Sequence, residues 1–325
     1  MFRSLYLLAI LIPLSLASPI VEVVYTIPIL PRLVVYFQTT HDSNGAPISM
    51  LPLIKDKSIA LTHIIISSFH VQKNREIHLN DFPPSDPMFY TLWNETRIMK
   101  EAGVKVMGMI GGAAPGSFTS ETLDGDEDVF EKYYTQIREV IFRYELDGLD
   151  IDVEQPMSQD GIERLIDKIH CDFGSGFIIT LAPVASALKN GGNLSGLDYK
   201  LLEYRKGCKI SFYNCQFYGG FGTMSSTKDY HDIVTNGFKA SRVVAGQLSS
   251  GTLTYDRLGQ LNINTTIVSL REKYGRIGGI MGWEYGLSVT RGMDEPWRWA
   301  QAMTQILRPK FLSSRATADQ LGGGI

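Results

Sequence analysis

The sequence predicts a single (β/α)8 barrel, an α/β TIM-barrel fold, and three observations lead to this fold class. The chain has 325 residues and 44% of them are hydrophobic, which is enough for one barrel of about 250 residues with additions. Eight short runs rich in β-branched and aromatic residues alternate with segments of helical periodicity. These runs are almost continuously apolar, as expected for parallel strands that helices cover. No internal repeat or long linker indicates a second domain.

The eight expected strands follow one another along the chain, and each leads into a polar or Gly-rich stretch. The first run, 33–37, precedes the polar loop 38–45. The third, 104–110, ends in the pair Gly111-Gly112. The expected strands are 33–37, 62–69, 104–110, 147–154, 177–182, 210–218, 243–248 and 278–284.

Helical periodicity fills several of the intervals between these strands. A helix is expected at 88–101, and 128–144 places apolar side chains at three- and four-residue spacing. Ser158 is a suitable N-cap for the helix after the fourth strand. A closing helix over 295–307 would begin at Pro296, since proline suits a first helical turn.

The fourth expected strand, 147–154, carries four carboxylates. Because side chains alternate along a strand, Asp150, Asp152 and Glu154 share one face and the aliphatic residues between them share the other. Neighbours on one face lie about 7 Å apart, close enough for each charge to affect the protonation of the next. The alternative is a solvated edge strand, but the abrupt end at Gln155-Pro156 favours a catalytic strand that leads into a loop.

In such barrels the active site lies at the C-terminal ends of the strands, so the last polar or aromatic side chains of each strand are candidates. Glu154 ends the fourth strand, and repulsion from the neighbouring carboxylates favours its protonated form, as a general acid requires. Asp152 is its expected partner. The other candidates at the strand ends are Gly111, Gly112, Gln216, Tyr218, Trp283 and Glu284.

The N-terminus has the features of a secretory signal peptide, which we expect over 1–17. An apolar run follows Arg3, and small residues precede the cleavage point after Ala17. The run is shorter than the ~20 residues of a membrane-spanning helix and is interrupted by Pro13, which argues against a retained anchor. We expect 18–31 to be a segment open to trimming, 32–311 to be the folded domain and 312–325 to be a disordered tail.

Three glycosylation sequons agree with secretion to the extracellular space. Only three cysteines are present, which allows at most one disulfide. We expect buried thiols, with Cys215 inside a strand. A bridge from Cys208 to Cys215 would require that strand to bend, so the pairing stays open. The sequon asparagines are Asn94, Asn193 and Asn264, and the third cysteine is Cys171.

Charge and motif content exclude several classes of function. The net charge is −3 and no dense Lys/Arg run occurs, which argues against nucleic acid or an anionic membrane as the main partner. The Gly-rich stretch 108–116 lacks the pattern of a nucleotide loop. Asp124 begins a calcium-like acidic series that lacks the required Gly and Glu, and the histidines show no metal-ligand spacing. We expect no cofactor, no metal and a neutral substrate.

The pattern on the fourth strand resembles the D-x-x-D-x-D-x-E motif of glycoside hydrolase family 18, the chitinase and endo-β-N-acetylglucosaminidase family. The motif is highly specific, and it is complete here as Asp147, Asp150, Asp152 and Glu154. The resemblance extends over the barrel, because Gly111-Gly112, Tyr218 and Trp283 match the family's strand-three glycines, strand-six tyrosine and strand-eight tryptophan.

Two positions depart from the family pattern. Met109 stands where S-x-G-G has its serine, and Gly219 follows the tyrosine where chitinases often have Asp or Asn. These losses of polar groups weaken the case for a chitinase. The segments 36–42 and 152–157 are instead similar to secreted fungal endo-β-N-acetylglucosaminidases, which cut the chitobiose core of N-glycans.

The resemblance implies substrate-assisted hydrolysis with retained configuration. Glu154 would protonate the glycosidic oxygen, the 2-acetamido carbonyl of the −1 sugar would attack C1, and Asp152 would hold the acetamide N–H. Asp150 would share a proton with Asp152. Tyr218, with Gln216 as a further donor, would bind the acetamide oxygen, and Trp283 would stack on the sugar. The remaining expected substrate-binding residues are Asp147, Gly111 and Gly112.

We therefore expect an endo-β-N-acetylglucosaminidase, with a chitinase acting on chitin oligomers as the alternative. An inactive chitinase-like lectin is a third hypothesis, but such lectins typically lose the catalytic glutamate, and Glu154 is present. The expected partner is an oligosaccharide that contains N-acetylglucosamine. No membrane partner is expected after signal removal, and the protein should be a monomer.

Overall fold

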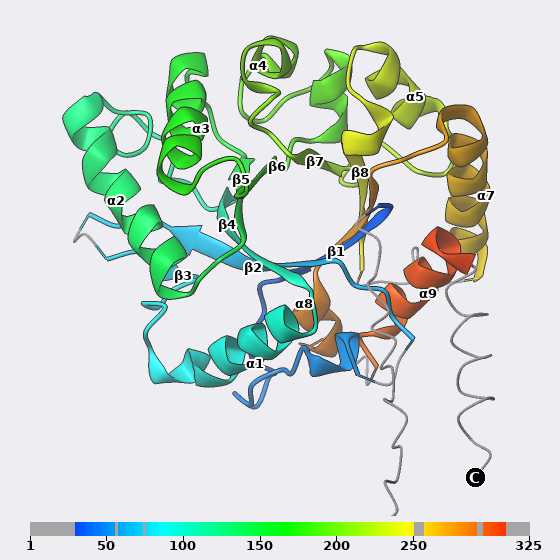
Figure 1. Ribbon diagram of the computed structural model, residues 1–325, viewed down its shortest axis with the longest axis horizontal. Helices are drawn as coiled ribbons and strands as arrows, with labels where there is room; N and C mark the ends of the chain where they lie inside the picture. The colour runs from blue at the N-terminus through cyan, green and yellow to red at the C-terminus, as the bar shows by residue number, and fades with distance from the viewer. Residues whose placement is uncertain (1–29, 56–57, 74–75, 250–256, 291–294, 310–325) are drawn as a thin grey trace, which may run out of the picture.

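A computed structural model of the chain describes residues 30–55, 58–73, 76–249, 257–290 and 295–309. Within these residues, eight parallel strands close into a barrel with helices around it (Figure 1). Closure occurs at β1 (Arg32–Phe37), which pairs with both β2 (His63–His70) and β9 (Gly279–Trp283). The predicted (β/α)8 barrel is confirmed. The other barrel strands are β4 (Lys105–Gly112), β5 (Gly148–Val153), β6 (Ile178–Leu181), β7 (Phe212–Gln216) and β8 (Val243–Leu248).

An additional short strand, β3 (His78–Leu79), pairs antiparallel with the end of β2. The register places Phe69 opposite Leu79 and His70 opposite His78. This strand lies in the polar stretch after the second expected strand. Two residues are too few to give a period-two pattern, so the sequence carried no signal for it.

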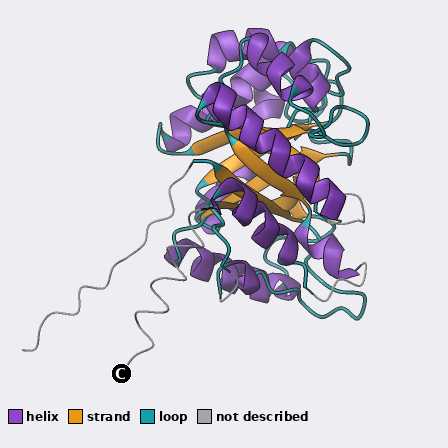
Figure 2. Cartoon of the chain, turned by 90° about the vertical axis from the view of Figure 1, so that its right-hand side faces the viewer, coloured by secondary structure: helices purple, strands orange, loops and turns teal. Residues whose placement is uncertain are grey.

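The helices surround the strands, as Figure 2 shows from the side. Ser158 caps α3 as predicted, because its hydroxyl accepts a hydrogen bond from the Gly161 backbone N–H at 3.0 Å. The closing helix begins at Arg298 rather than 295, since a turn from Glu295 to Arg298 precedes it and contains Pro296. The α-helices are α1 (Tyr90–Glu101), α2 (Glu127–Arg143), α3 (Gln159–Phe173), α4 (Tyr199–Lys206), α5 (Lys228–Thr235), α7 (Arg257–Tyr274), α8 (Tyr285–Thr290) and α9 (Arg298–Leu307), and the 3-10 turns are η1 (Leu51–Leu53), η2 (Pro87–Phe89), η3 (Ala185–Lys189) and η4 (Ala240–Arg242).

Two apolar clusters hold the barrel together. The larger fills the space between the strands and the helices, and it includes Leu149 and Ile151 of β5. The smaller cluster lies inside the barrel. Asp150 and Asp152 are buried in the interior-facing register of the same strand, so the predicted alternation along β5 is confirmed. The members of the inner cluster are Val34, Tyr36, Ile65, Met107, Met109, Phe212, Val244 and Met281.

The cysteines do not all behave as expected. Cys215 is buried in β7, but Cys171 and Cys208 are exposed, and all three are free thiols. The expectation of three buried thiols is therefore wrong. Cys171 lies on α3 outside the buried stripe, and Cys208 follows the end of α4.

The expected signal peptide (1–17), nearly all of the segment 18–31 and the tail 312–325 lie outside the described residues. Within the part of the chain that the structure describes, no helix is both long and apolar enough to cross a membrane.

Candidate active site

A cavity of about 300 Å³ lies at the C-terminal ends of the barrel strands. It brings together most of the residues that the sequence singled out, from strands far apart in the chain. Asp152 comes from β5 and Glu154 directly follows that strand, Gln216 ends β7 and Tyr218 follows it, and Trp283 ends β9. The other lining residues are Gln38, Ser68, His70, Gly111, Gly112, Ala113 and Ala114.

Asp150 lies beneath this cavity and is fully buried. Its carboxylate accepts hydrogen bonds from the Tyr36 hydroxyl at 2.6 Å, the Thr180 hydroxyl at 2.5 Å and the Asn214 amide at 3.1 Å. Burial raises the pKa of Asp150, and these hydrogen bonds limit the rise because they favour the ionised form. The same burial, followed by the charge of Asp150, raises the pKa of Tyr36 well above its usual value. Tyr36 therefore remains a donor.

Asp152 experiences a different environment on the same strand face. Burial raises its pKa well above the usual range, and the nearby charges of Glu154 and Asp150 raise it further. Among the described residues, the side-chain donor to Asp152 is Gln216, at 3.3 Å. Asp150 accepts three side-chain hydrogen bonds and Asp152 accepts one, so the surroundings favour the ionised form more strongly at Asp150 than at Asp152.

Gln216 links the two carboxylates that line the cavity. Its amide nitrogen lies 2.9 Å from Glu154 Oε1 and 3.3 Å from Asp152 Oδ1, and it also lies 3.0 Å from the Ala182 carbonyl oxygen. The amide N–H groups are thus occupied by protein acceptors. In this arrangement Gln216 orients Glu154, a role that differs from the expected donation to the substrate.

Tyr218 and Trp283 supply the aromatic part of the cavity. Burial raises the pKa of Tyr218 well above its usual value, and the charges of Asp152 and Glu154 add to the rise. Its hydroxyl therefore keeps the proton and can donate. The Trp283 ring is partly buried and meets the edge of Tyr36 with 5.4 Å between centroids. An aromatic face at this place suits stacking against the apolar face of a sugar ring.

The Gly111-Gly112 pair leaves space for the neighbouring strand. Gly111 has φ +99, and a Cβ there would lie 2.3 Å from the Asp152 carbonyl oxygen and 2.4 Å from the Phe118 ring. Gly112 has φ +88, and a Cβ there would lie 3.2 Å from the methyl group of Met109. Both positions therefore require glycine, because a side chain would collide or strain the backbone.

Asp147 lies at the other end of β5 from the cavity. Its carboxylate accepts a hydrogen bond from the Val106 backbone N–H at 2.9 Å and lies 3.7 Å from Lys105 Nζ. These contacts tie the beginning of β4 to the beginning of β5. The prediction that Asp147 binds substrate does not fit this position. The residue has the opposite parity to Asp150 and Asp152 and precedes the strand.

Glu284, directly after β9, also has a structural role. It is buried, and its carboxylate accepts hydrogen bonds from the backbone N–H groups of Gln38 at 3.1 Å and Gly286 at 3.0 Å. These bonds connect the residues after β1 to those after β9. Glu284 therefore shapes the mouth of the barrel and does not line the small cavity.

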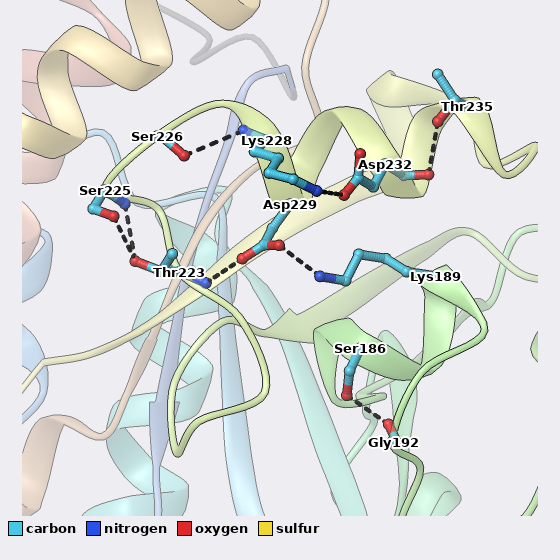
Figure 3. A network of polar contacts seen from close by, with 10 residues as sticks. All are labelled: Ser186, Lys189, Gly192, Thr223, Ser225, Ser226, Lys228, Asp229, Asp232 and Thr235. Carbon is cyan, nitrogen blue, oxygen red and sulfur yellow. Dashed lines mark hydrogen bonds and ion pairs between the residues drawn. The ribbon is translucent and has the colours of Figure 1, made fainter.

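The loop after Tyr218 is anchored to the neighbouring loop by a polar network (Figure 3). Lys189 Nζ lies 2.5 Å from Asp229 Oδ1, and the Thr223 backbone N–H donates to Asp229 Oδ2 at 2.9 Å. Both charged side chains are mostly buried. The network fixes the segment that follows Gly219 on this side of the mouth.

A second cavity of about 1000 Å³ adjoins the first. The two share Gln38, His70, Ala114 and Trp283. The larger cavity runs over the segments that follow β1, β2, β4 and β9. In the described part of the chain, no group of three or more His, Cys, Asp or Glu residues is arranged to hold a metal ion.

This barrel has a half-buried glutamate at the mouth, a buried pair of aspartates behind it and an aromatic floor beside it. Such a site is typical of a glycoside hydrolase, because it combines a proton donor with a surface for a sugar ring.

Residues 32–267 match the family model described as Glycosyl hydrolases family 18, and the chain belongs to this family.

Comparison with known proteins shows similarity to two kinds of enzyme in this family. The structure of a fungal endo-beta-N-acetylglucosaminidase is 58% identical, with 86% of this chain and 99% of that chain covered and a TM-score of 0.82. The structure of a chitinase from Aspergillus fumigatus is 45% identical, with 84% and 98% covered and a TM-score of 0.74.

Curated relatives are more distant. Endochitinase 4 of Metarhizium anisopliae is 28% identical over 157 residues, which are 43% of this chain and 54% of that protein. Endochitinase 37 of Trichoderma harzianum is 25% identical over 198 residues, which are 56% of each. The chain thus spans about half the length of these curated relatives.

Proposed function

We propose that this protein is an endo-β-N-acetylglucosaminidase that hydrolyses the β-1,4 bond in the chitobiose core of N-glycans with retention of configuration. The carboxylates of the small cavity carry this proposal. Of the described residues that line it, Asp152 and Glu154 are the acids; Asp152 lies in β5 and Glu154 directly follows that strand. A conventional retaining glycosidase places its nucleophile across the bond from the acid. Asp152 and Glu154 are instead neighbours on one side of the cavity, which supports a nucleophile supplied by the substrate, its 2-acetamido group.

The first step moves one proton and exchanges one bond at C1. Glu154 gives its proton to the glycosidic oxygen as the C1–O bond breaks, and the carbonyl oxygen of the 2-acetamido group bonds to C1. Asp152 accepts the acetamide N–H, which a protonated carboxyl can still do through its second oxygen. Tyr218 donates toward the acetamide oxygen. As positive charge develops on the ring that forms, the nearby Asp150 carboxylate stabilises it.

The second step restores the enzyme. Glu154, now a carboxylate, takes a proton from a water molecule that attacks C1 from the side of the departed sugar. The bond between C1 and the acetamide oxygen breaks, and the product keeps the original configuration. Gln216 holds Glu154 through the hydrogen bond at 2.9 Å, so the same group is in position for both proton transfers.

The likeness to a fungal endo-beta-N-acetylglucosaminidase at 58% identity supports N-glycans as the substrate. Gly219 is exposed and carries no polar side chain where many chitinases have one, which agrees with this choice. A chitinase is the second candidate, and the 45% identity to the Aspergillus fumigatus chitinase favours it. An inactive lectin is a weaker third candidate because Glu154 is present and lies in the cavity.

One comparison of products separates these candidates. A high-mannose glycoprotein and chitin oligomers are incubated with the protein, and the products are identified by mass spectrometry. Released glycans that end in a single N-acetylglucosamine, with one N-acetylglucosamine left on asparagine, are the expected result. Cleavage of chitin alone would contradict the N-glycan proposal, and binding without cleavage of either substrate would indicate a lectin.

Secretion and glycosylation are further parts of the proposal. The N-terminal sequence supports export, and the three sequons lie in different surroundings. Asn264 is exposed on α7, whereas Asn94 is half-buried on α1. The Asn193 amide nitrogen donates to the Leu197 carbonyl oxygen at 2.7 Å. We expect Asn264 to be the best acceptor, which peptide mapping of the secreted, monomeric protein would test.

A further inference from the structure

The order of the groups along the mouth assigns a direction to the bound glycan. Glu154 lines the small cavity and not the large one, while Trp283 lines both. In the proposed function, Glu154 acts on the bond at the reducing side of the −1 sugar, and Trp283 is the floor under that sugar. The large cavity beyond Trp283 therefore faces the non-reducing part of the glycan.

The two cavities differ in volume and therefore in the number of sugar rings that each can hold. Ligand pockets typically measure about 300–1,000 Å³. The catalytic cavity of about 300 Å³ is at the lower end and suits one sugar ring, while the cavity of about 1000 Å³ is at the upper end and has room for several.

Phe82 is an exposed aromatic residue in the lining of the large cavity. Its side chain is 46% exposed, although a phenyl ring gains free energy when it is removed from water. Polar side chains line the same cavity, among them His41, Asn80, Asp81 and Gln72. A flat apolar face beside donors and acceptors matches the chemistry of a sugar ring, which has an apolar C–H face and a rim of hydroxyl groups.

The turn that carries Phe82 is fixed to the strands beneath the catalytic cavity. The Leu79 N–H donates to the Phe82 carbonyl oxygen at 2.8 Å. Asn80 donates from its side chain to the Gln38 carbonyl oxygen at 3.0 Å and accepts from the Ser68 N–H at 3.2 Å. Gln38 and Ser68 themselves line the catalytic cavity. The backbone that carries the ring is thus held in place before any ligand arrives, which reduces the ordering that binding requires.

We propose that Phe82 is a specificity-determining residue whose ring stacks against a sugar on the non-reducing side of the cleaved bond, beyond the −1 site. This inference rests on the proposed function, in which that part of the substrate is the mannose-bearing arm of the N-glycan. Because the contact is far from the reacting atoms, it stabilises the bound substrate and the transition state equally. Its loss raises KM and leaves kcat unchanged.

The test compares Phe82→Ala with the parent on a long and a short substrate. The long substrate is a high-mannose glycopeptide, and the short one is a fluorogenic glycoside of N-acetylglucosamine, whose single sugar fills only the −1 site. We expect KM for the glycopeptide to rise about tenfold in Phe82→Ala, with kcat within about twofold of the parent. Both constants for the short substrate should stay unchanged, and Phe82→Tyr should restore KM because it keeps the ring.

Phe142→Ala is the matched control, since Phe142 is a 62% exposed phenylalanine that does not belong to the lining of either cavity. It should leave KM for the glycopeptide unchanged. An unchanged KM in Phe82→Ala, or an equal loss on both substrates, would overturn the proposal.

If the parent enzyme cleaves chitin oligomers and no glycopeptide, the proposed function fails and Phe82 is tested separately. The comparison is then between chitohexaose and the short glycoside. A rise of KM for chitohexaose alone would keep the stacking role, and no rise would overturn it.

Discussion

Replacing Tyr36 by Phe tests how the barrel interior keeps a charge on Asp150. The Tyr36 hydroxyl donates to Asp150 Oδ2 at 2.6 Å in a fully buried site. A hydrogen bond to a charged group contributes about 1.5–3 kcal/mol. If the Asp150 carboxylate stabilises the transition state, loss of this donor should lower kcat about 10- to 150-fold. KM should change little, because the Phe ring keeps the edge contact with Trp283.

The pH dependence provides a second readout with a definite sign. Burial already raises the pKa of Asp150, and the loss of a donor to its ionised form raises it further. Asp150 then becomes neutral at a higher pH than in the parent. The acid limb of the profile of kcat/KM against pH should therefore move to higher pH.

Tyr213→Phe is the control for this experiment. Tyr213 is also buried, and its hydroxyl donates to Glu203 at 2.7 Å, on the helix side of the barrel. This variant removes the same kind of hydrogen bond without touching Asp150, so its acid limb should match the parent. A Tyr36→Phe enzyme with the parent's kcat and acid limb would refute the reasoning that this hydroxyl maintains the charge of Asp150.

Three further substitutions test individual groups of the site. Glu154→Gln should lower kcat about 10²- to 10⁴-fold while glycan binding measured by calorimetry persists, and intact hydrolysis would show that the acid is assigned wrongly. Asp152→Asn should slow the first step and lower kcat more than it changes KM, so a defect confined to KM would argue against assistance by the substrate. Gly111→Ala should destabilise the fold by about 1–3 kcal/mol, because the new Cβ would lie 2.3 Å from the Asp152 carbonyl oxygen at φ +99. Gly45→Ala, at φ +80 with open space around it, should lower the melting temperature less.

The alternation of side chains along β5 made the heart of the site predictable. A period of two is a local property, so the sequence alone predicted that Asp150 and Asp152 share one face of the strand and that Leu149 and Ile151 share the other. The rule that active sites lie at the C-terminal ends of barrel strands then selected Glu154, Tyr218 and Trp283. These residues do meet at one cavity.

The partners of Asp150 could not be predicted in the same way. Tyr36, Thr180 and Asn214 come from β1, β6 and β7, and nothing in those short runs marks an inward polar group as the donor to an acid elsewhere. Their assignment needs the register between strands, which places Thr180 beside Asp150. Register is set by contacts between distant segments.

Asp147 shows that the residues of one sequence motif need not act as a single functional unit. Its spacing from Asp150 fits the family pattern, but its parity and its place before the strand put it on the Val106 backbone. A residue can thus complete a sequence motif by fastening two strands together rather than by contacting substrate.

In our proposals, the residues that carry out the reaction and those that select the substrate lie in different parts of this chain. In the proposed function the reacting acids are Asp152 in β5 and Glu154 directly after it, in the cavity of about 300 Å³, whereas the cavity of about 1000 Å³ is built largely from the segments after β1 and β2. A relative that keeps the acidic strand can therefore change substrate through those segments alone. The short strand β3 and the turn to Phe82 belong to such a segment, and their hydrogen bonds to Gln38 and Ser68 fix the turn relative to the catalytic cavity. This connection is the reason to seek the contact with the non-reducing part of the substrate at Phe82 rather than in the acidic motif.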